Sequence, residues 1–80
     1  MTVNVRYFAA AAAAAGVDEE TVGPGSLAEI VEQIGAKHGA LMIKVLPACS
    51  FLIDGMATTD QQTTVDAGQS IDVLPPFAGG

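Results

Sequence analysis

The sequence predicts an α+β fold in which one mixed sheet carries a single main helix on one face. Apolar and polar residues alternate near both ends of this chain of 80 residues, as they do in half-buried strands. Between these ends, residues 26–38 carry apolar residues at helical spacing. The length fits one small domain, and we find no internal repeat or linker.

The first elements are expected in residues 2–25. Val3, Val5 and Tyr7 alternate with polar neighbours, which predicts a strand. The alanines at 9–15 favour a short helix that Gly16 ends, although an alanine-rich loop is an alternative because so short a helix is weak alone. Residues 18–23 then predict a brief strand, and the Gly-Pro-Gly run at 23–25 predicts a turn.

The main helix is predicted at residues 26–38. Ser26 and Glu29 have the spacing of a capping box at its start, and Gly39 ends it. A single apolar stripe follows the helical period: Leu27, Ile30, Val31 and Ile34.

The second half of the chain is expected to complete the sheet. Residues 40–47 predict a helical turn or an irregular crossing that Pro47 breaks. Residues 49–53 predict a strand that leads into a turn at Asp54 and Gly55. Residues 56–65 are polar and leave room for one short edge strand, and residues 69–75 predict the last strand, with Ile71 and Val73 on one face.

The first and last strands have the clearest pattern, so we place them side by side in the centre of the sheet. Parallel pairing is plausible because the rest of the chain supplies a long crossover. This arrangement is the β-grasp, or ubiquitin-like, fold, with a domain at residues 1–74 and an extended reactive tail at residues 75–80. The expected core consists of Val3, Val5, Tyr7, Val22, Leu27, Ile30, Val31, Ile34, Leu41, Ile43, Leu46, Phe51, Ile53, Val65, Ile71 and Val73.

The charge and the cysteine content of the chain limit the kinds of partner and of metal site that are expected. The net charge is −6, which disfavours nucleic acid and membrane surfaces and suits a basic protein partner, or reflects solubility alone. One cysteine excludes an internal disulfide and a cysteine-based metal site, and no metal is expected. With neither a secretory signal nor an apolar run of membrane-spanning length in sight, we expect a cytoplasmic protein.

The last six residues have the composition of a projecting arm. Pro75 and Pro76 cannot donate hydrogen bonds to a sheet, so the last strand must stop there, and they hold the following chain extended. Phe77 is a large apolar anchor. The alternative is a terminus with no role.

The end of this arm is small enough for a narrow channel in a partner. Ala78, Gly79 and Gly80 have almost no side chains, so a partner could approach the backbone closely. The reactive group would be the α-carboxylate of Gly80. Adenylation by a separate ATP-using enzyme would activate it, and attack by a sulfur donor would leave a C-terminal thiocarboxylate.

Three apolar side chains are expected on the face of the sheet away from the helix. Phe8, Leu52 and Leu74 fall on the opposite phase from the core residues of their strands. They are either ordinary exposed residues or a docking patch beside the tail, and we favour the patch.

The stretches VNVRYFAAAAAAAG, CSFLIDG and TVDAGQSIDVLPPFAGG resemble the MoaD family of ubiquitin-like sulfur carriers, the small subunits of molybdopterin synthase. This resemblance implies that a ubiquitin-activating-like adenylyltransferase activates Gly80 with ATP and that a sulfur donor protein converts it to a thiocarboxylate. The tail would then enter the large synthase subunit, in a heterotetramer, and deliver sulfur for the molybdopterin dithiolene. The carrier itself would bind no cofactor stably. Members of the family often carry an arginine within the first alanine-rich segment, where this chain has plain alanine around Ala12.

Other chemically capable side chains are assigned structural roles. Cys49 is expected to be a packed or half-buried thiol, and His38 to complement the dipole at the helix end. Asp18, Glu19 and Glu20 are expected on the solvated surface.

No catalytic constellation is visible, so a carrier is predicted rather than an enzyme. The alternatives are a carrier for thiamine or cysteine synthesis, a ubiquitin-like protein modifier and a non-covalent interaction module.

Overall fold

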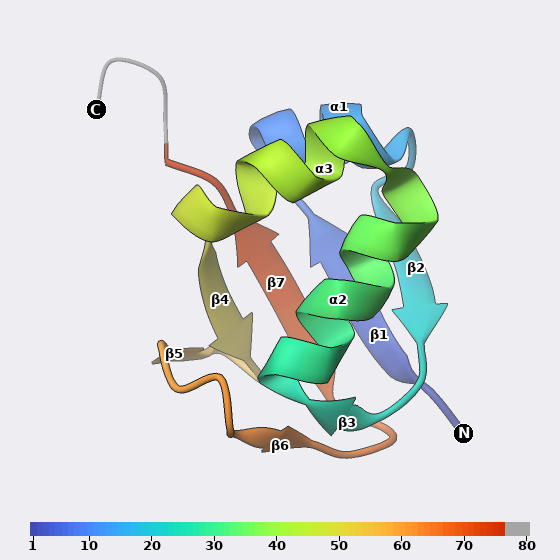
Figure 1. The fold of residues 1–80 in the computed structure, drawn as a ribbon. Helices are drawn as coiled ribbons and strands as arrows, with labels where there is room; N and C mark the ends of the chain where they lie inside the picture. Colours follow the sequence, from blue (N-terminus) through green and yellow to red (C-terminus); the bar gives the residue numbers. More distant parts are fainter. Residues whose placement is uncertain (77–80) are drawn as a thin grey trace.

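The computed structural model describes residues 1–76, which form a five-stranded sheet covered on one face by helices (Figure 1). The strand order is β2-β1-β7-β4-β5. The central strands β1 and β7 run parallel, and the other neighbouring pairs are antiparallel, which confirms the predicted centre of the sheet. The strands are β1 (Val3–Tyr7), β2 (Glu19–Val22), β4 (Ser50–Ile53), β5 (Met56–Thr58) and β7 (Ser70–Leu74).

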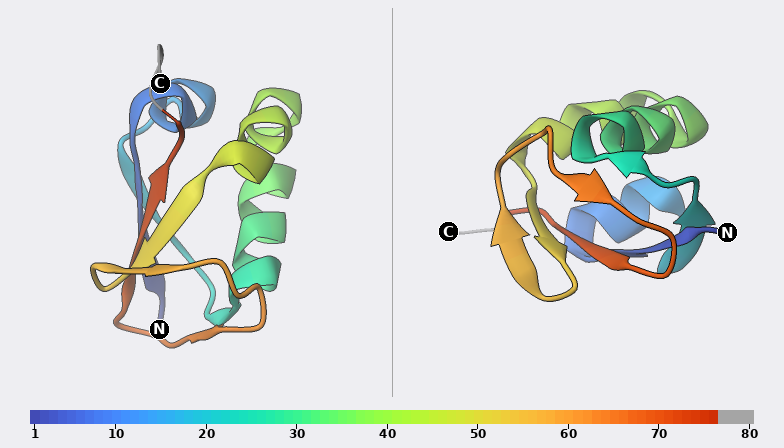
Figure 2. Two further views of the ribbon diagram at one scale, coloured as in Figure 1. Left: turned by 90° about the vertical axis from the view of Figure 1, so that its left-hand side faces the viewer. Right: turned by 90° about the horizontal axis from the view of Figure 1, so that it is seen from below.

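The helix α2 (Leu27–His38) lies across one face of this sheet (Figure 2). Ser26 and Glu29 form the predicted capping box, in which the Ser26 Oγ accepts from the Glu29 amide at 3.2 Å and the Glu29 Oε1 accepts from the Ser26 amide at 2.9 Å. Of the predicted apolar stripe, Val31 is half-buried, and the other three members are fully buried. Burial of these side chains against the sheet is the main stabilising contribution of the helix.

The shorter elements follow from local turn chemistry. The helix α1 (Ala9–Ala15) forms in preference to a loop, and Gly16 ends it in the left-handed conformation with φ of 75°. Asp54 and Gly55 both have positive φ, 48° and 83°, which suits the two-residue hairpin that joins β4 to β5. The strands β3 (Gly25–Ser26) and β6 (Thr64–Val65) form a small second sheet that the sequence analysis did not predict.

Two residues predicted in the core are exposed, and that prediction is wrong. In α3 (Ala40–Val45), Leu41 is 67% exposed and Ile43 is 57% exposed. The buried residues of this region are instead Met42 and Leu46, the latter in the 3-10 helix η1 (Leu46–Ala48). Each residue turns a helix by about 100°, so Met42 and Leu46 share one side and their apolar neighbours point elsewhere.

None of the helices within residues 1–76 combines the length and the apolar character needed to span a lipid bilayer.

Candidate functional site

The face of the sheet opposite α2 gathers the three apolar residues that the sequence analysis placed there. Leu52 lies beside Asp72 in the β4–β7 ladder, and Arg6 lies beside Asp72 in the β1–β7 ladder. The Phe8 amide donates to the Val73 carbonyl at 3.2 Å, which places Phe8 next to Leu74 at the end of the same two strands. We call this surface, made of Arg6, Phe8, Leu52, Asp72 and Leu74, the outer face.

Exposure differs across this face. Phe8 is 37% exposed, whereas Leu52 and Leu74 are half-buried. Phe8 follows β1, Leu74 ends β7 and Leu52 lies in β4, so these side chains come from three neighbouring segments and a flat partner could contact all of them together.

An ion pair joins the two central strands on the outer face. Arg6 donates from Nε to Asp72 Oδ1 at 2.8 Å and from Nη2 to Asp72 Oδ2 at 3.0 Å. The Arg6 guanidinium carbon lies 5.6 Å from the centre of the Phe8 ring. The hydrogen bond to Asp72 and the negative charge of that residue raise the pKa of Arg6. The sequence analysis missed this pair, although both residues fall on the outward phase of strands that it predicted to be neighbours.

The tail begins at the end of β7, the central strand. Leu74 is the last residue of β7 and lies opposite Ser50 of β4. Pro75 is buried and Pro76 is exposed, so the first proline belongs to the packed body of the domain. The predicted reactive carboxylate of Gly80 lies outside the described residues, as do Phe77, Ala78 and Gly79. Their predicted roles therefore stay predictions.

A hollow of about 370 Å³ adjoins the outer face. Arg6 and Phe8 line it on one side, and Ala12, Asp18 and Glu19 complete its rim. Ala12 belongs to the alanine-rich segment in which the MoaD resemblance leads one to expect an arginine.

Glu20 is not on the solvated surface, which corrects the prediction made for it. Its carboxylate accepts hydrogen bonds from the Tyr7 hydroxyl and the His38 Nε2, and Lys37 Nζ lies 2.7 Å from its Oε1. The Tyr7 and His38 rings meet edge to face, with centroids 5.7 Å apart. His38 therefore does more than complement the helix dipole, because this cluster ties β1 and β2 to the end of α2. The signal was present in the alternation of β2, whose inward phase falls on Glu20 and Val22.

We expect this cluster to make the domain sensitive to acid. Partial burial alone raises the pKa of Glu20, but hydrogen bonds from His38, Lys37 and Tyr7 outweigh it and lower the pKa from 4.5 to about 2. A depressed pKa in the folded state means that the stabilisation is complete above the unfolded value of 4.5. It should be lost as the pH falls from there to about 2, at a cost of about 2 kcal/mol.

Urea unfolding measured at steps between neutral and strongly acidic pH checks this expectation. Glu20→Gln removes the titrating group, so its free energy of unfolding should change less than that of the unchanged protein across the same window. Equal pH dependence in both proteins would contradict the assignment to Glu20.

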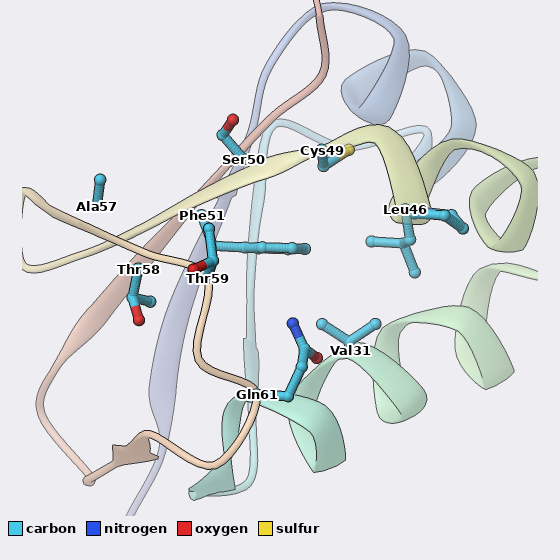
Figure 3. A pocket seen from close by; sticks show the side chains of 10 residues that line it. Val31, Leu46, Cys49, Ser50, Phe51, Ala57, Thr58, Thr59 and Gln61 are labelled. Atoms are coloured by element: carbon cyan, nitrogen blue, oxygen red, sulfur yellow. The ribbon is translucent and has the colours of Figure 1, made fainter.

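Cys49 is a half-buried structural thiol, as predicted. Its Sγ donates to the Val45 carbonyl at 3.3 Å, and burial raises the pKa of the thiol, which disfavours the reactive thiolate. Cys49 borders a hollow of about 540 Å³ beside α2, where Figure 3 shows Val31 and Gln61 facing Phe51.

Comparisons with known proteins agree on one family. The model of the ThiS family matches residues 5–80. The molybdopterin synthase sulfur carrier subunit of Chlamydomonas reinhardtii is 34% identical over 85 residues, and the alignment covers 100% of both chains.

Solved structures support the fold. SAMP1 from Haloferax volcanii aligns with a TM-score of 0.85 and 22% identity over 100% of each chain. A chain in the complex of subunits 1 and 2 of the molybdopterin-converting factor from Helicobacter pylori aligns with a TM-score of 0.76 and 22% identity, again over 100% of each chain. These likenesses confirm the ubiquitin-like β-grasp fold, and the sequence matches confirm the predicted kinship with small sulfur carriers. The chain therefore belongs to the ThiS family.

Proposed function

We propose that this protein is a sulfur carrier that acts as the small subunit of molybdopterin synthase. The observation that carries the proposal is the match, over its whole length, to a relative named as the sulfur carrier subunit of that synthase. The Pro-Pro-Phe-Ala-Gly-Gly run follows the central strand directly, so the proposed reactive end extends from the most firmly held part of the sheet. The protein is a carrier without an active site of its own, and its partners supply the catalysis.

Sulfur is loaded stepwise on the Gly80 carboxylate. An adenylyltransferase joins this carboxylate to the AMP part of ATP and releases pyrophosphate. A persulfide sulfur on a donor protein then attacks the acyl carbon and displaces AMP. A thiol next reduces the sulfur–sulfur bond that still joins the acyl group to the donor, which releases the donor and leaves a thiocarboxylate. The large subunit uses that sulfur to build the dithiolene of molybdopterin, and an oxygen atom from water restores the carboxylate. The carrier holds no cofactor, because ATP is bound by the activating enzyme.

The outer face is the proposed docking surface for these partners. Phe8, Leu52 and Leu74 supply apolar contact area close to the root of the tail. The charge of −6 speeds encounter with basic partner surfaces more than it adds affinity. Together with the large subunit the carrier forms a heterotetramer, in which the tail enters the catalytic cavity of the partner.

The proposal is tested by the mass of the C-terminal peptide. The protein is produced together with an adenylyltransferase and a sulfur donor, then cleaved before Asp72. The peptide Asp72–Gly80 contains neither methionine nor cysteine, so oxidation cannot imitate the mass gained when sulfur replaces oxygen. Sulfur on this peptide is expected, followed by dithiolene formation when the large subunit and the pterin precursor are added.

Two results would contradict the proposal. An unmodified carboxylate, obtained with enzymes shown to act on a known carrier, would exclude the carrier function. A ladder of larger species that survives reducing, denaturing electrophoresis would indicate a protein modifier instead.

We expect Phe77→Ala to weaken binding to the large subunit by roughly 2 kcal/mol or more, because a buried aromatic anchor can dominate an interface. Isothermal titration calorimetry with the isolated large subunit measures this loss. Met56→Ala is the control, since Met56 is 74% exposed on the edge strand β5, away from the tail. Equal affinity of the Phe77 variant and the unchanged protein would mean that Phe77 serves only as a spacer.

A further inference from the structure

We propose that Arg6, held in place by Asp72, is a specificity-determining residue of the outer face. It selects a partner surface that offers a neutral oxygen acceptor, either a backbone carbonyl or a side-chain amide, within an otherwise apolar contact. This inference rests on the proposed function, because it concerns the surface by which the carrier docks on the large subunit.

Arg6 has more hydrogen-bond donors than Asp72 can satisfy. A guanidinium group has five N–H donors, and Asp72 accepts from two of them, one on Nε and one on Nη2. Among residues 1–76, no other side chain or carbonyl accepts a hydrogen bond from this group. In the free protein, water satisfies the remaining donors. A partner that covers the outer face removes this water and must replace it with oxygen atoms, or the complex loses affinity.

The Arg6 guanidinium is fixed before a partner binds. Two parallel hydrogen bonds to Asp72 set its plane, and the Phe8 ring lies 5.6 Å from its central carbon. The Arg6 side chain is 51% exposed, whereas that of Asp72 is only 15% exposed. The free donors therefore face the solvent with a defined direction, and an acceptor must match that direction to be bound without a large loss of conformational entropy.

The charges around Arg6 favour a neutral acceptor on the partner. Arg6 lies between two carboxylates, because Asp72 is its neighbour on β7 and Glu19 is its cross-strand neighbour on β2. Both carboxylates raise the pKa of Arg6, which shows that both act on it electrostatically. One positive and two negative charges leave this site negative, as is the whole chain at −6. A partner carboxylate would be repelled, whereas a carbonyl or amide oxygen could accept from Arg6 without that penalty.

The apolar residues around Arg6 make its hydrogen bond to the partner a source of selectivity between partners. Phe8, Leu52 and Leu74 would bind almost any apolar surface of suitable shape. An Arg–Asp pair beside them adds affinity only for a partner that supplies the acceptor, since desolvation of the pair offsets much of the gain elsewhere. It imposes a cost on every partner that lacks the acceptor, which is how a polar group in an apolar interface discriminates.

The test uses a double variant that replaces the pair with apolar residues and keeps the net charge, Arg6→Met with Asp72→Leu. We expect its Kd for the large subunit to rise at least about tenfold, because the acceptor on the partner is left without a donor. The matched control is Lys44→Met with Glu32→Leu, which removes one positive and one negative charge from exposed positions on the helices. Its Kd should not change.

Arg6→Lys separates geometry from charge. Lysine keeps the positive charge and can still pair with Asp72 but lacks the fixed fork, so we expect a similar loss. This variant also keeps the test decisive if the double variant unfolds. Unchanged affinity for either folded variant would overturn the inference.

The salt dependence of this loss of affinity distinguishes a neutral oxygen acceptor from a carboxylate. The loss caused by Arg6→Met, Asp72→Leu should be equal at low and high salt when the acceptor is neutral. A loss that shrinks at high salt would overturn the neutral acceptor in favour of a carboxylate. Failure of the proposed function is seen separately, because then the unchanged protein would neither bind the large subunit nor carry sulfur on the peptide Asp72–Gly80.

Discussion

Removal of Gly80 should abolish sulfur loading and leave the fold intact. The shortened chain still ends in a glycine with a carboxylate, but that carboxylate falls short by about 3.4 Å, the length of one extended residue. A misplacement of about 1 Å in a reacting group can already cost about 100-fold in rate, so a shift of this size should leave no measurable thiocarboxylate. The measurement is the mass of the C-terminal peptide after incubation with the adenylyltransferase, ATP and the sulfur donor.

Ala78→Gly is the control for this deletion, because it preserves the length of the tail and the terminal Gly-Gly. It should load sulfur at close to the normal rate. Both variants should unfold at the same urea concentration as the unchanged protein, since the sheet and the core lie within residues 1–76. Sulfur on the shortened chain would show that the terminal carboxylate need not sit at one fixed position, which would contradict the proposed mechanism.

Glu20→Gln should produce the largest loss of stability among single polar changes in this domain. The carboxylate accepts from Tyr7 and His38 and pairs with Lys37, so its replacement by an amide turns a donor toward groups that are donors themselves. Leaving such part-buried groups without acceptors costs about 2–3 kcal/mol. That is a large share of the roughly 4–12 kcal/mol expected for a domain of this length.

Glu19→Gln provides a matched control one position away. Glu19 is exposed, and its hydrogen bond from Asn4 is long at 3.4 Å, so the free energy of unfolding should change by no more than about 0.5 kcal/mol. Urea unfolding at neutral pH compares the two variants. Equal stability of both would mean that the Glu20 cluster contributes no more than an ordinary surface contact.

The parts of the fold that sequence analysis predicted well are those with local signals. Alternation predicted β1 and β7, the capping box at Ser26 predicted the start of α2, and the Asp-Gly pair predicted the turn after β4. Each of these signals acts within a few residues, so it can be read without knowing what packs against it.

The orientation of α3 could not be predicted because nearly every residue of that helix is apolar, so no period marks a buried side. Its position depends on Gly35 of α2, which lets Ile43 approach so closely that a β-carbon there would lie 3.1 Å from Ile43 Cγ1. This close contact joins α2 to α3, and no sequence pattern within either helix predicts it. The alternation of β2 could have placed Glu20 on the inward face, but its partners His38 and Lys37 come from the far end of α2, which no local pattern connects to β2.

The outer face was partly predictable. The outward phase of the strands is enough to predict that Phe8, Leu52 and Leu74 share one face of the sheet. The pairing of Arg6 with Asp72 also required the register of β1 against β7, which alternation alone leaves open.

Because β7 lies in the centre of the sheet, the domain can fold only after β7 has been synthesised. Within residues 1–76 all other elements precede β7 in the chain, yet β1 and β4 both pair with it, so the two halves of the sheet have no common strand until β7 is made. A nascent or truncated chain that lacks β7 should remain unfolded and be removed by proteases. Folding must also await pairing between strands distant in the chain, which makes it slow. The folded pool in a cell is therefore restricted to molecules whose chain has been synthesised at least to Leu74, the residue from which the tail begins.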